Sequence, residues 1–539
     1  MKLPCRIVVC CLQVWLACFA TAQVAVTTYQ YDNYRSGTNT LETTLTLANV
    51  NVDQFGREAI FNVTGYVYAQ PLYVPNVNIG GVLHNVLYIA TEHDQVYAFD
   101  VNSGQQLWNR NLLISTGPLI QVSPISSSDV NCNDLVPEIG ITGTPVIDVA
   151  NDEMFLVANT KEINLVTQTT NFFQTIYALD IRTGALRTPP HRVTGQVPGT
   201  GQGSQNGYLT FDPLLEGQRA SLLLSNGQVF AAWASHCDNG AFHGWLMSFD
   251  ELTLYTRGVF VDTPNGSEGG FWGSGSGPAA DSAGSIYVGT GNGTYDTDSD
   301  YGDSILRLNL AGSGLMLADY FTPWDQEMLD DTDTDLGSGG VTLLPDQPGS
   351  PYPHLLVQAG KEGTIDLVNR DNMGHFNPVN DDQIVQTLPF IIGGLFGGPA
   401  FWNNNAYFGG INDNLKDFTY DPQAQLLSTS PTSQSAETFT FPGPTPAISS
   451  NGVEDGIVWI VETDNANGGL AVLRAYNASD LSVELYNSLQ NPSRDSAGNA
   501  VKFVVPTVAD GQVFVAAQNQ VAMYGLLSSD PGPRHSSGR

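Results

Sequence analysis

The sequence predicts an all-β fold, a single β-propeller with eight blades. Three observations predict it: a unit with several strands recurs along the chain, no segment keeps a helical apolar period over three turns, and Gly and Pro are abundant, at 56 and 30 of 539 residues. Repeats of roughly 40–60 residues with several strands each favour a propeller, because radial closure protects the edges of the sheets. A β-helix would need shorter and stricter periods, and an array of sandwiches would need linkers.

Each unit is expected to open with a short apolar strand, in most units directly after a proline. Runs of β-branched and aromatic residues between Gly, Asn and Asp turns supply the strands that follow, as in VLYIATEHDQVYAFD. The last unit has too few strands, so Arg57–Val63 (REAIFNV) is expected to complete it and close the ring. The eight expected first strands are QPLYV (Pro71), TPVID (Pro145), ASLLLS (Leu223), GPAAD (Pro278), GGVTLL (Val341), GPAFW (Pro399), TPAIS (Pro446) and PTVAD (Pro506).

The two ends of the chain differ in character from the repeats. Lys2 and Arg6 precede an almost wholly apolar run, and Ala20-Thr21-Ala22 has the form of a small-x-small cleavage site, which predicts a secretory signal peptide over residues 1–22. A retained membrane anchor is the alternative. The propeller is expected over residues 23–527 and a disordered Ser/Gly/Pro tail over 528–539. No later run reaches ~18 apolar residues, so the mature chain should not span a membrane.

Cys132 and Cys237 are the cysteines that remain after the leader. In an oxidising compartment, two cysteines most simply form one disulfide, and two buried free thiols are the alternative. The sequons at Asn62, Asn265, Asn292 and Asn477 would be glycosylated in a eukaryotic source. A secreted, extracellular protein is therefore expected, or a periplasmic one in a bacterium.

The chain is strongly acidic, with a formal net charge of −33. Such a field repels phosphate backbones and anionic lipids, which argues against nucleic-acid and membrane partners. No G-x-S-x-G, H-E-x-x-H or P-loop motif occurs, so hydrolase and nucleotide-dependent functions have no positive indication. The acidic runs DSDYGDS and DDTDTD could bind Ca²⁺ or could be solvated loops. A monomer with a small-molecule or carbohydrate ligand is expected.

Two repeats end in AFDVNSGQQLW (Ala98–Trp108) and ALDIRTGALR (Ala178–Arg187). Their form, A-x-D-x-x-[ST]-G-x-x-x-W, resembles the repeat of pyrroloquinoline-quinone (PQQ) type propellers. In that repeat the Gly permits a tight turn and the Trp docks between blades. These residues therefore indicate the architecture and carry no chemistry.

Two further segments resemble the PQQ-dependent alcohol dehydrogenases. GGFWGSGSGPAADSAGSIYVGTGN ends in a G-x-G-N, and the resemblance implies that the quinone stacks on Trp272 and that Asn292 binds a metal ion. FTPWDQEMLDDTDTDLGSGG follows, and it implies a catalytic base at Asp335, with Asp333 as the second choice.

The remaining implied residues come from two more segments. HLLVQAGKEGTIDLVNR implies that Lys361 contacts the quinone oxygens, and ITGTPVIDVANDEMFLVANTKE implies that Glu162 is a metal ligand. A divalent cation such as Ca²⁺ would then act as a Lewis acid on the quinone, beside a carboxylate that accepts the substrate proton. The five side chains are expected to converge at one axial cavity.

The chain departs from this family in three places. It lacks the adjacent cysteine pair, residues 221–260 add a unit between those of Glu162 and Asn292, and the run from Asp325 to Asp335 is longer. Two functions therefore stay open. One is a metal- and quinone-assisted oxidoreductase for an alcohol or sugar-like substrate, and the other is a non-catalytic extracellular binding or scaffold propeller.

Overall fold

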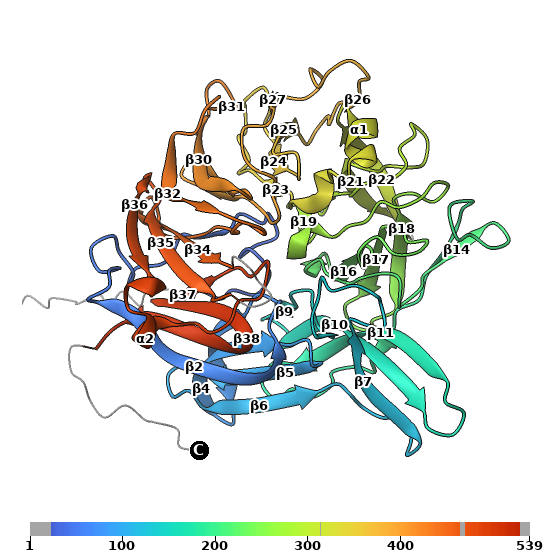
Figure 1. The fold of residues 1–539 in the computed structure, drawn as a ribbon, viewed down its shortest axis with the longest axis horizontal. Helices are drawn as coiled ribbons and strands as arrows, with labels where there is room; N and C mark the ends of the chain where they lie inside the picture. The colour runs from blue at the N-terminus through green and yellow to red at the C-terminus, as the bar shows by residue number, and fades with distance from the viewer. Residues whose placement is uncertain (1–22, 313, 464–468, 529–539) are drawn as a thin grey trace, which may run out of the picture.

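The computed structural model describes residues 23–312, 314–463 and 469–528, and it has the all-β propeller fold that the repeats predict. Eight sheets of three to six strands succeed one another along the described residues, and Figure 1 shows them arranged radially. The predicted leader and residues 529–539 of the predicted tail lie outside the described residues. The eight-blade count and the closed ring stay predictions, which this order of sheets supports.

The first four sheets lie between residues 72 and 376. The first contains β3 (Leu72–Ile79), β4 (Val82–Ala90), β5 (Gln95–Asp100) and β6 (Gln106–Asn111). The second contains β9 (Val146–Asp148), β10 (Glu153–Asn164), β11 (Thr170–Asp180) and β12 (His191–Arg192), with β7 (Ile120–Ser126) and β8 (Glu138–Ile139) added at β10. The third contains β15 (Leu223–Ser225), β16 (Gln228–Trp233), β17 (Trp245–Asp250) and β18 (Thr256–Val261). The fourth contains β19 (Ala279–Ala280), β20 (Ile286–Gly289), β21 (Ile305–Ala311), β22 (Gly314–Thr322) and β26 (His375–Phe376).

The other four sheets follow in the same manner. The fifth contains β23 (Thr342–Leu343), β24 (Leu355–Ala359), β25 (Ile365–Asn369) and β27 (Gln386–Leu388). The sixth contains β28 (Ala400–Trp402), β29 (Asn405–Gly409), β30 (Asp413–Asp421), β31 (Leu426–Leu427) and β32 (Ser433–Phe439). The seventh contains β33 (Ala447–Asn451), β34 (Glu454–Glu462), β35 (Val472–Asn477), β36 (Asp480–Asn487) and the short β1 (Thr38–Asn39). The eighth contains β37 (Thr507–Ala509), β38 (Gln512–Leu526) and β2 (Phe55–Tyr66).

The remaining elements are small. A separate hairpin is formed by β13 (Gln196–Pro198) and β14 (Tyr208–Thr210), and it precedes the third sheet. The helical elements are α1 (Gln326–Asp331), α2 (Pro492–Asp495) and three 3₁₀ turns, η1 (Gly273–Gly275), η2 (Leu336–Ser338) and η3 (Ser488–Gln490). Within the described ranges, no helix is long and apolar enough to cross a bilayer.

All eight expected first strands form, one in each sheet. Six of them, β3, β9, β19, β28, β33 and β37, begin at the residue after a proline. Proline lacks the N–H that a strand interior needs, so it is accepted just before the ladder starts. The expected partner of the last unit is also found, because β2 contains Arg57–Val63 and pairs antiparallel with β38, with Phe55 opposite Leu526.

Trp108 docks between neighbouring sheets, as the repeat implies. Its indole Nε1 donates to the Ile181 carbonyl of the next sheet at 3.0 Å. Gly184 lies beneath the ring with φ +67°, and a Cβ there would come within 2.7 Å of the indole. The turn glycine is therefore required by both its backbone conformation and the ring that covers it.

The sequence did not indicate that residues 26–39, here called the N-terminal segment, connect the sheets to one another. This segment makes main-chain hydrogen bonds to the first strands of six sheets. Arg35, only 1% exposed, extends the connection to the third sheet through the Leu222 carbonyl at 3.1 Å. The main-chain partners of the segment are Tyr73, Ile147, Ala280, Leu343, Phe401 and Ile448.

Candidate functional site

A cavity of about 590 Å³, here called the central cavity, lies among the loops that connect the strands. Its walls combine acidic, basic and aromatic side chains. Six acids line it: Asp134, Asp238, Glu268, Asp330, Asp333 and Asp335. Three bases line it, Arg219, Lys361 and Lys502, with five aromatic residues, Phe242, Trp272, Phe396, Phe441 and Phe503.

Asp335 is the acid that the surrounding groups hold most firmly. It directly precedes η2 and is 7% exposed. Its Oδ1 accepts the Asn292 main-chain N–H at 2.9 Å and the Trp272 indole N–H at 3.4 Å, while Oδ2 lies 2.5 Å from Lys361 Nζ. Four of the five side chains expected at one cavity are therefore brought together.

The longer run before Asp335 is accommodated by α1. Residues 326–331 form this helix, which the sequence did not predict, and the Gln326 amide ties it to the Gly293 carbonyl at 2.9 Å. The chain then returns to the cavity, where the Lys361 main-chain N–H donates to the Asp335 carbonyl at 2.9 Å. The extra residues are thus placed in the helix, and Asp335 keeps its place beside Trp272.

Lys361 forms ion pairs with two carboxylates. Its Nζ lies 2.5 Å from an oxygen of Asp333 as well as 2.5 Å from Asp335. Burial alone would lower the pKa of Lys361, but the charge and hydrogen bonds of Asp335 and Asp333 outweigh it and raise the pKa above its usual value. The ammonium therefore stays charged at neutral pH.

The two carboxylates that contact Lys361 differ in exposure. The side chain of Asp333 is 70% exposed, whereas that of Asp335 is 10% exposed. Asp333 also accepts the Asn292 side-chain N–H at 3.1 Å. Within the described part of the chain, the buried Asn292 Oδ1 has no hydrogen-bond partner, so this acceptor remains available to a ligand.

The other acids of the cavity differ in the direction of their pKa shifts. Burial raises the pKa of Asp238, Glu268 and Asp330, and nearby carboxylates raise each further. The pKa of Asp134 is lowered instead, because the charges of Arg219 and Lys502 outweigh the effect of its burial.

A second group of cations, missed in the sequence, lies on the aromatic wall. The Arg219 guanidinium lies 4.3 Å from the centre of the Phe503 ring and 5.6 Å from that of Trp272. Lys502 Nζ lies 2.9 Å from Asp134 Oδ1, and burial followed by the Arg219 charge lowers the pKa of Lys502 to about 8. The one indication in the sequence that these residues belong to a site was the scarcity of bases, with 20 Lys and Arg in all.

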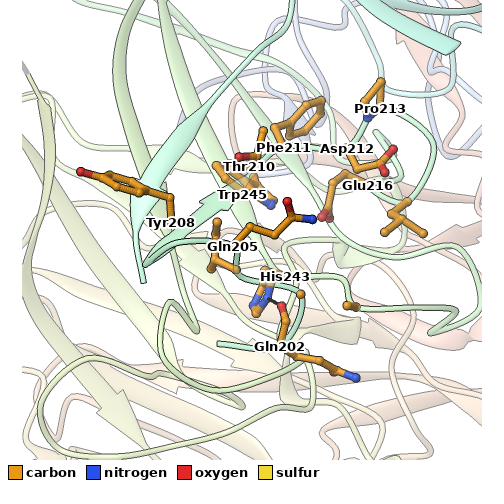
Figure 2. A pocket seen from close by; sticks show the side chains of 14 residues that line it. Gln202, Gln205, Tyr208, Thr210, Phe211, Asp212, Pro213, Glu216, His243 and Trp245 are labelled. Carbon is orange, nitrogen blue, oxygen red and sulfur yellow. Dashed lines mark hydrogen bonds between the residues drawn. The ribbon is translucent and has the colours of Figure 1, made fainter. Parts of the chain in front are cut away.

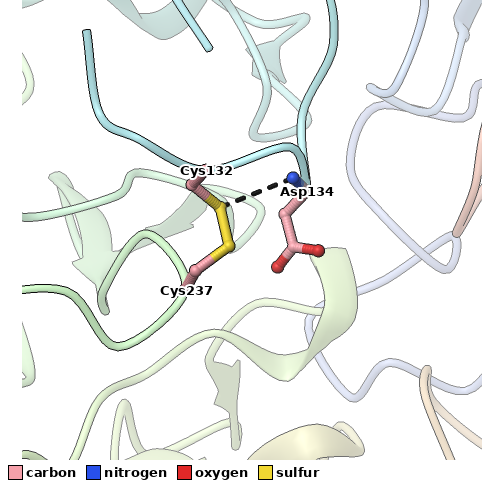
Figure 3. Close-up of side chains that lie close together, drawn as sticks. All are labelled: Cys132, Asp134 and Cys237. Carbon is pink, nitrogen blue, oxygen red and sulfur yellow. Dashed lines mark hydrogen bonds between the residues drawn. A yellow bond between two sulfur atoms is a disulfide. The ribbon is translucent and has the colours of Figure 1, made fainter. Parts of the chain in front are cut away.

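Cys132 and Cys237 form the expected disulfide, with an S–S distance of 2.04 Å (Figure 3). Cys237 lines the central cavity, so the bond fastens the loop that carries Asp134 to the turn that carries Asp238. Figure 3 also shows Asp134, whose main-chain N–H donates to Cys132 Sγ at 3.4 Å.

The two cysteines and Asp134 also form a cluster of possible metal ligands. Among the described residues, they are the one group of three His, Cys, Asp or Glu ligand atoms within 4.8 Å of one another. Because both sulfurs are bonded to each other, the group is not a metal site.

Glu162 is the expected residue that the structure does not bring to the cavity. It lies in the long hairpin of β10 and β11, in register with Val122 of β7, and its Oε1 pairs with Arg192 at 2.7 Å. The sequence favours a turn at Lys161 and Glu162, between the second and third strands of this unit. Instead β10 continues to Asn164, which carries Glu162 away along the strand.

The four sequons differ in accessibility. Asn62 and Asn265 are exposed, whereas Asn292 and Asn477 are partly buried. Asn292 uses the side-chain nitrogen that a glycan would occupy to contact Asp333.

We expect glycosylation at Asn292 to be absent from the folded protein even in a eukaryotic host, because a glycan on this nitrogen would displace Asp333 and enter the cavity. Peptide mapping after enzymatic deglycosylation in heavy-oxygen water measures the occupancy of each sequon. Asn62, which is exposed, serves as the control, and full occupancy at Asn292 would contradict the arrangement around Asp333.

No protein-family model matches the sequence, and no curated protein matches it. Solved structures do match. The quinohemoprotein alcohol dehydrogenase from Comamonas testosteroni aligns with a TM-score of 0.58 at 14% identity, over 94% of this chain and 81% of that one. The chain has the PQQ-type propeller fold. Two further matches are the quinohemoprotein alcohol dehydrogenase ADHIIG from Pseudomonas putida (TM-score 0.56, 12% identity, 94% and 82% covered) and BamB from Moraxella catarrhalis (0.48, 11%, 87% and 99%).

Proposed function

We propose that this PQQ-type propeller binds a quinone in its central cavity and oxidises an alcohol or sugar-like substrate. One observation carries the proposal: a buried carboxylate, Asp335, is held by Trp272, Asn292 and Lys361 in a single cavity. A carboxylate fixed beside an aromatic face and a cation is suited to accept a proton from a bound substrate.

The chemistry of the cavity fits an anionic, planar quinone. The Trp272 indole offers a face for stacking, with Lys361 Nζ 5.7 Å from the ring centre. Arg219 and Lys502 provide further positive charge for carboxylate groups, and their placement is uncommon in so acidic a chain. A volume of about 590 Å³ lies within the range of small-molecule sites.

The two residues predicted to bind a cation, Glu162 and Asn292, do not lie at one site. Glu162 pairs with Arg192 outside the cavity, and the carboxylates nearest Asn292 already hold the Lys361 ammonium between them. The free Asn292 Oδ1 is a suitable ligand atom, but a divalent cation needs several oxygens. The proposed chemistry therefore contains no metal step.

In this reaction Asp335 takes the proton of the substrate hydroxyl. Lys361 stabilises negative charge that develops on oxygen during the transfer, since its own charge is maintained by the two carboxylates. The aromatic wall excludes water from one side of the cavity. A bound quinone would supply the acceptor for the hydride, the carbinol C–H hydrogen with its two electrons, so that the substrate would leave as an aldehyde or ketone.

The disulfide supports a secreted location for this activity. Such bonds persist in oxidising compartments and are rare in the cytosol. Secretion through the predicted leader is part of the proposal.

We expect purified protein to bind added PQQ saturably, and a Trp272→Ala variant to bind it about tenfold more weakly because a stacking face is lost. Quenching of tryptophan fluorescence and equilibrium dialysis measure the affinity, with and without Ca²⁺. Trp324→Ala is the matched control, since Trp324 is 50% exposed and does not line the central cavity among the described residues.

Saturable binding that Trp272→Ala weakens supports the quinone site. A higher affinity for PQQ in the presence of Ca²⁺ would show that a metal ion takes part in binding. Absence of PQQ binding by the folded wild-type protein would refute the quinone proposal and leave the non-catalytic binding propeller as the better explanation.

A further inference from the structure

A second cavity, of about 450 Å³, lies between the β13–β14 hairpin and β17 (Figure 2). Among the described residues, none that lines it also lines the central cavity. It is built by a segment of the chain, residues 202–216, that belongs to none of the eight main sheets. We call it the hairpin cavity.

One side of the hairpin cavity is aromatic. Phe211 and Trp245 are buried and pack edge to face, with ring centroids 5.6 Å apart. Tyr208, from β14, is 45% exposed. An exposed aromatic ring beside a buried aromatic pair offers an apolar surface to a ligand that reaches into the cavity.

The other side carries hydrogen-bonding groups of mixed type. The amides of Gln202 and Gln205 both donate and accept, as does the hydroxyl of Thr210. His243 Nε2 lies 2.8 Å from the Gln202 carbonyl and Nδ1 lies 2.9 Å from Thr263 Oγ1. These contacts anchor the segment that carries Gln202, so the polar wall is fixed in place.

Glu216 is the most informative residue of this cavity. It is 2% exposed, and its Oε2 has no hydrogen-bond partner in the described part of the chain. Figure 2 shows its carboxyl group and the Gln205 amide pointing toward one another in the cavity. A buried polar atom without a partner carries an energetic cost that a bound ligand removes.

The charge on the walls limits the class of ligand. Among the described lining residues none is Lys or Arg, and Asp212 adds an exposed acid, so an anion has no counter-charge. Burial raises the pKa of Glu216 well above its usual value, which favours the protonated carboxyl, a group that donates as well as accepts. An ammonium group would only donate, and would leave the amide N–H groups and the carboxyl proton without acceptors.

We propose that the hairpin cavity binds a neutral polyhydroxylated ligand, a sugar residue, with its hydroxyls on Gln202, Gln205 and Glu216 and its apolar face against Tyr208. Sugar hydroxyls donate and accept at once, which matches the amides of Gln202 and Gln205 and the unpartnered Oε2 of Glu216. The site is separate from the central cavity, and it does not depend on the quinone proposal.

The test uses the full-length mature protein and four sugars as probes: D-glucose, D-galactose, D-mannose and N-acetyl-D-glucosamine. Saturation-transfer difference NMR reports binding, and titration of each sugar gives its affinity. At least one sugar is expected to bind. Tyr208→Ala and Gln205→Ala are each expected to weaken it about tenfold, because each removes one contact from a site that is otherwise intact.

Tyr255→Ala is the matched control, since Tyr255 is 63% exposed, directly precedes β18 and does not line the cavity. Trp272→Ala should also leave sugar binding unchanged, which separates this site from the central one. Three results would overturn the proposal: no binding of any of the four sugars, equal binding by Tyr208→Ala and wild type, or binding of choline in place of a sugar. All the substituted side chains are exposed or line a cavity, and circular dichroism checks that each variant is folded.

Discussion

An Asp335→Asn variant is expected to lose about 10²–10⁴-fold in turnover of an alcohol by the PQQ-loaded protein, because the amide cannot accept the substrate proton. Asparagine has the same shape and can still accept the N–H groups of Trp272 and Asn292, so quinone affinity should change little. Reduction of a dye acceptor with ethanol or D-glucose as substrate measures turnover, and fluorescence quenching measures the quinone affinity in the same samples.

Asp333→Asn is the matched control for this prediction. Asp333 contacts the same Lys361 ammonium at the same distance of 2.5 Å, but its side chain is largely exposed. Its loss should cost much less turnover if Asp335 is the base. A larger loss from Asp333→Asn would transfer the role of base to Asp333, and equal activity of Asp335→Asn and wild type would exclude Asp335 from proton transfer.

The unfolding free energy is expected to fall as the pH rises from about 4.5 to about 8, because Glu92 enters the folded protein as a neutral acid. It is fully buried, and burial raises its pKa to about 8 although Gly140 N–H and the Thr142 hydroxyl donate to Oε2 at 2.6 and 3.0 Å. Below pH 4.5 both states hold the proton, so no stability is lost there. Between the two pKa values the folded state alone retains it, and each pH unit costs up to about 1.4 kcal/mol.

A Glu92→Gln variant is expected to reduce this slope by the share of Glu92, about 4 kcal/mol between pH 5 and pH 8, since a neutral amide needs no proton. Other buried acids, such as Asp262, whose pKa burial raises to about 7, keep their own share. Urea unfolding at several pH values measures it. The control is Glu327→Gln, whose exposed side chain stays in solvent in the folded state. A slope that Glu92→Gln leaves unchanged would show that Glu92 is ionised in the folded protein or that another buried acid, such as Asp94, dominates.

The fold could be predicted from the sequence because its rules are local. Proline before a first strand and alternating residues within it act over a few residues each, and they predicted all eight first strands. The docking of Trp108 on the next sheet followed from the repeat of the turn motif along the chain. The pairing of β2 with β38 followed from counting strands in the last unit. The N-terminal segment escaped prediction because main-chain hydrogen bonds to six sheets leave no pattern in side chains.

The site was predictable only where a motif lay close to the residue it concerned. Trp272, Asn292 and Lys361 lie within short matching segments, and all three reach the cavity. Glu162 does not, because β10 continues past the point where a turn was expected. Arg219 and Lys502 lie 283 positions apart in the numbering of the chain, and no local pattern connects two bases that meet at the Phe503 ring and at Asp134.

The N-terminal segment has a consequence for the order in which the protein matures. Val26 to Gly37 are made early, yet the carbonyl of Gly37 bonds to Ile448, which is made more than 400 residues later. Val26 can pair with Tyr73 soon after both are made, but the end of the segment at Gly37 has no partner until most of the sheets have been synthesised. Contacts of such high sequence separation slow folding, so translation that stops early would release a chain whose N-terminal segment lacks the later first strands that it connects.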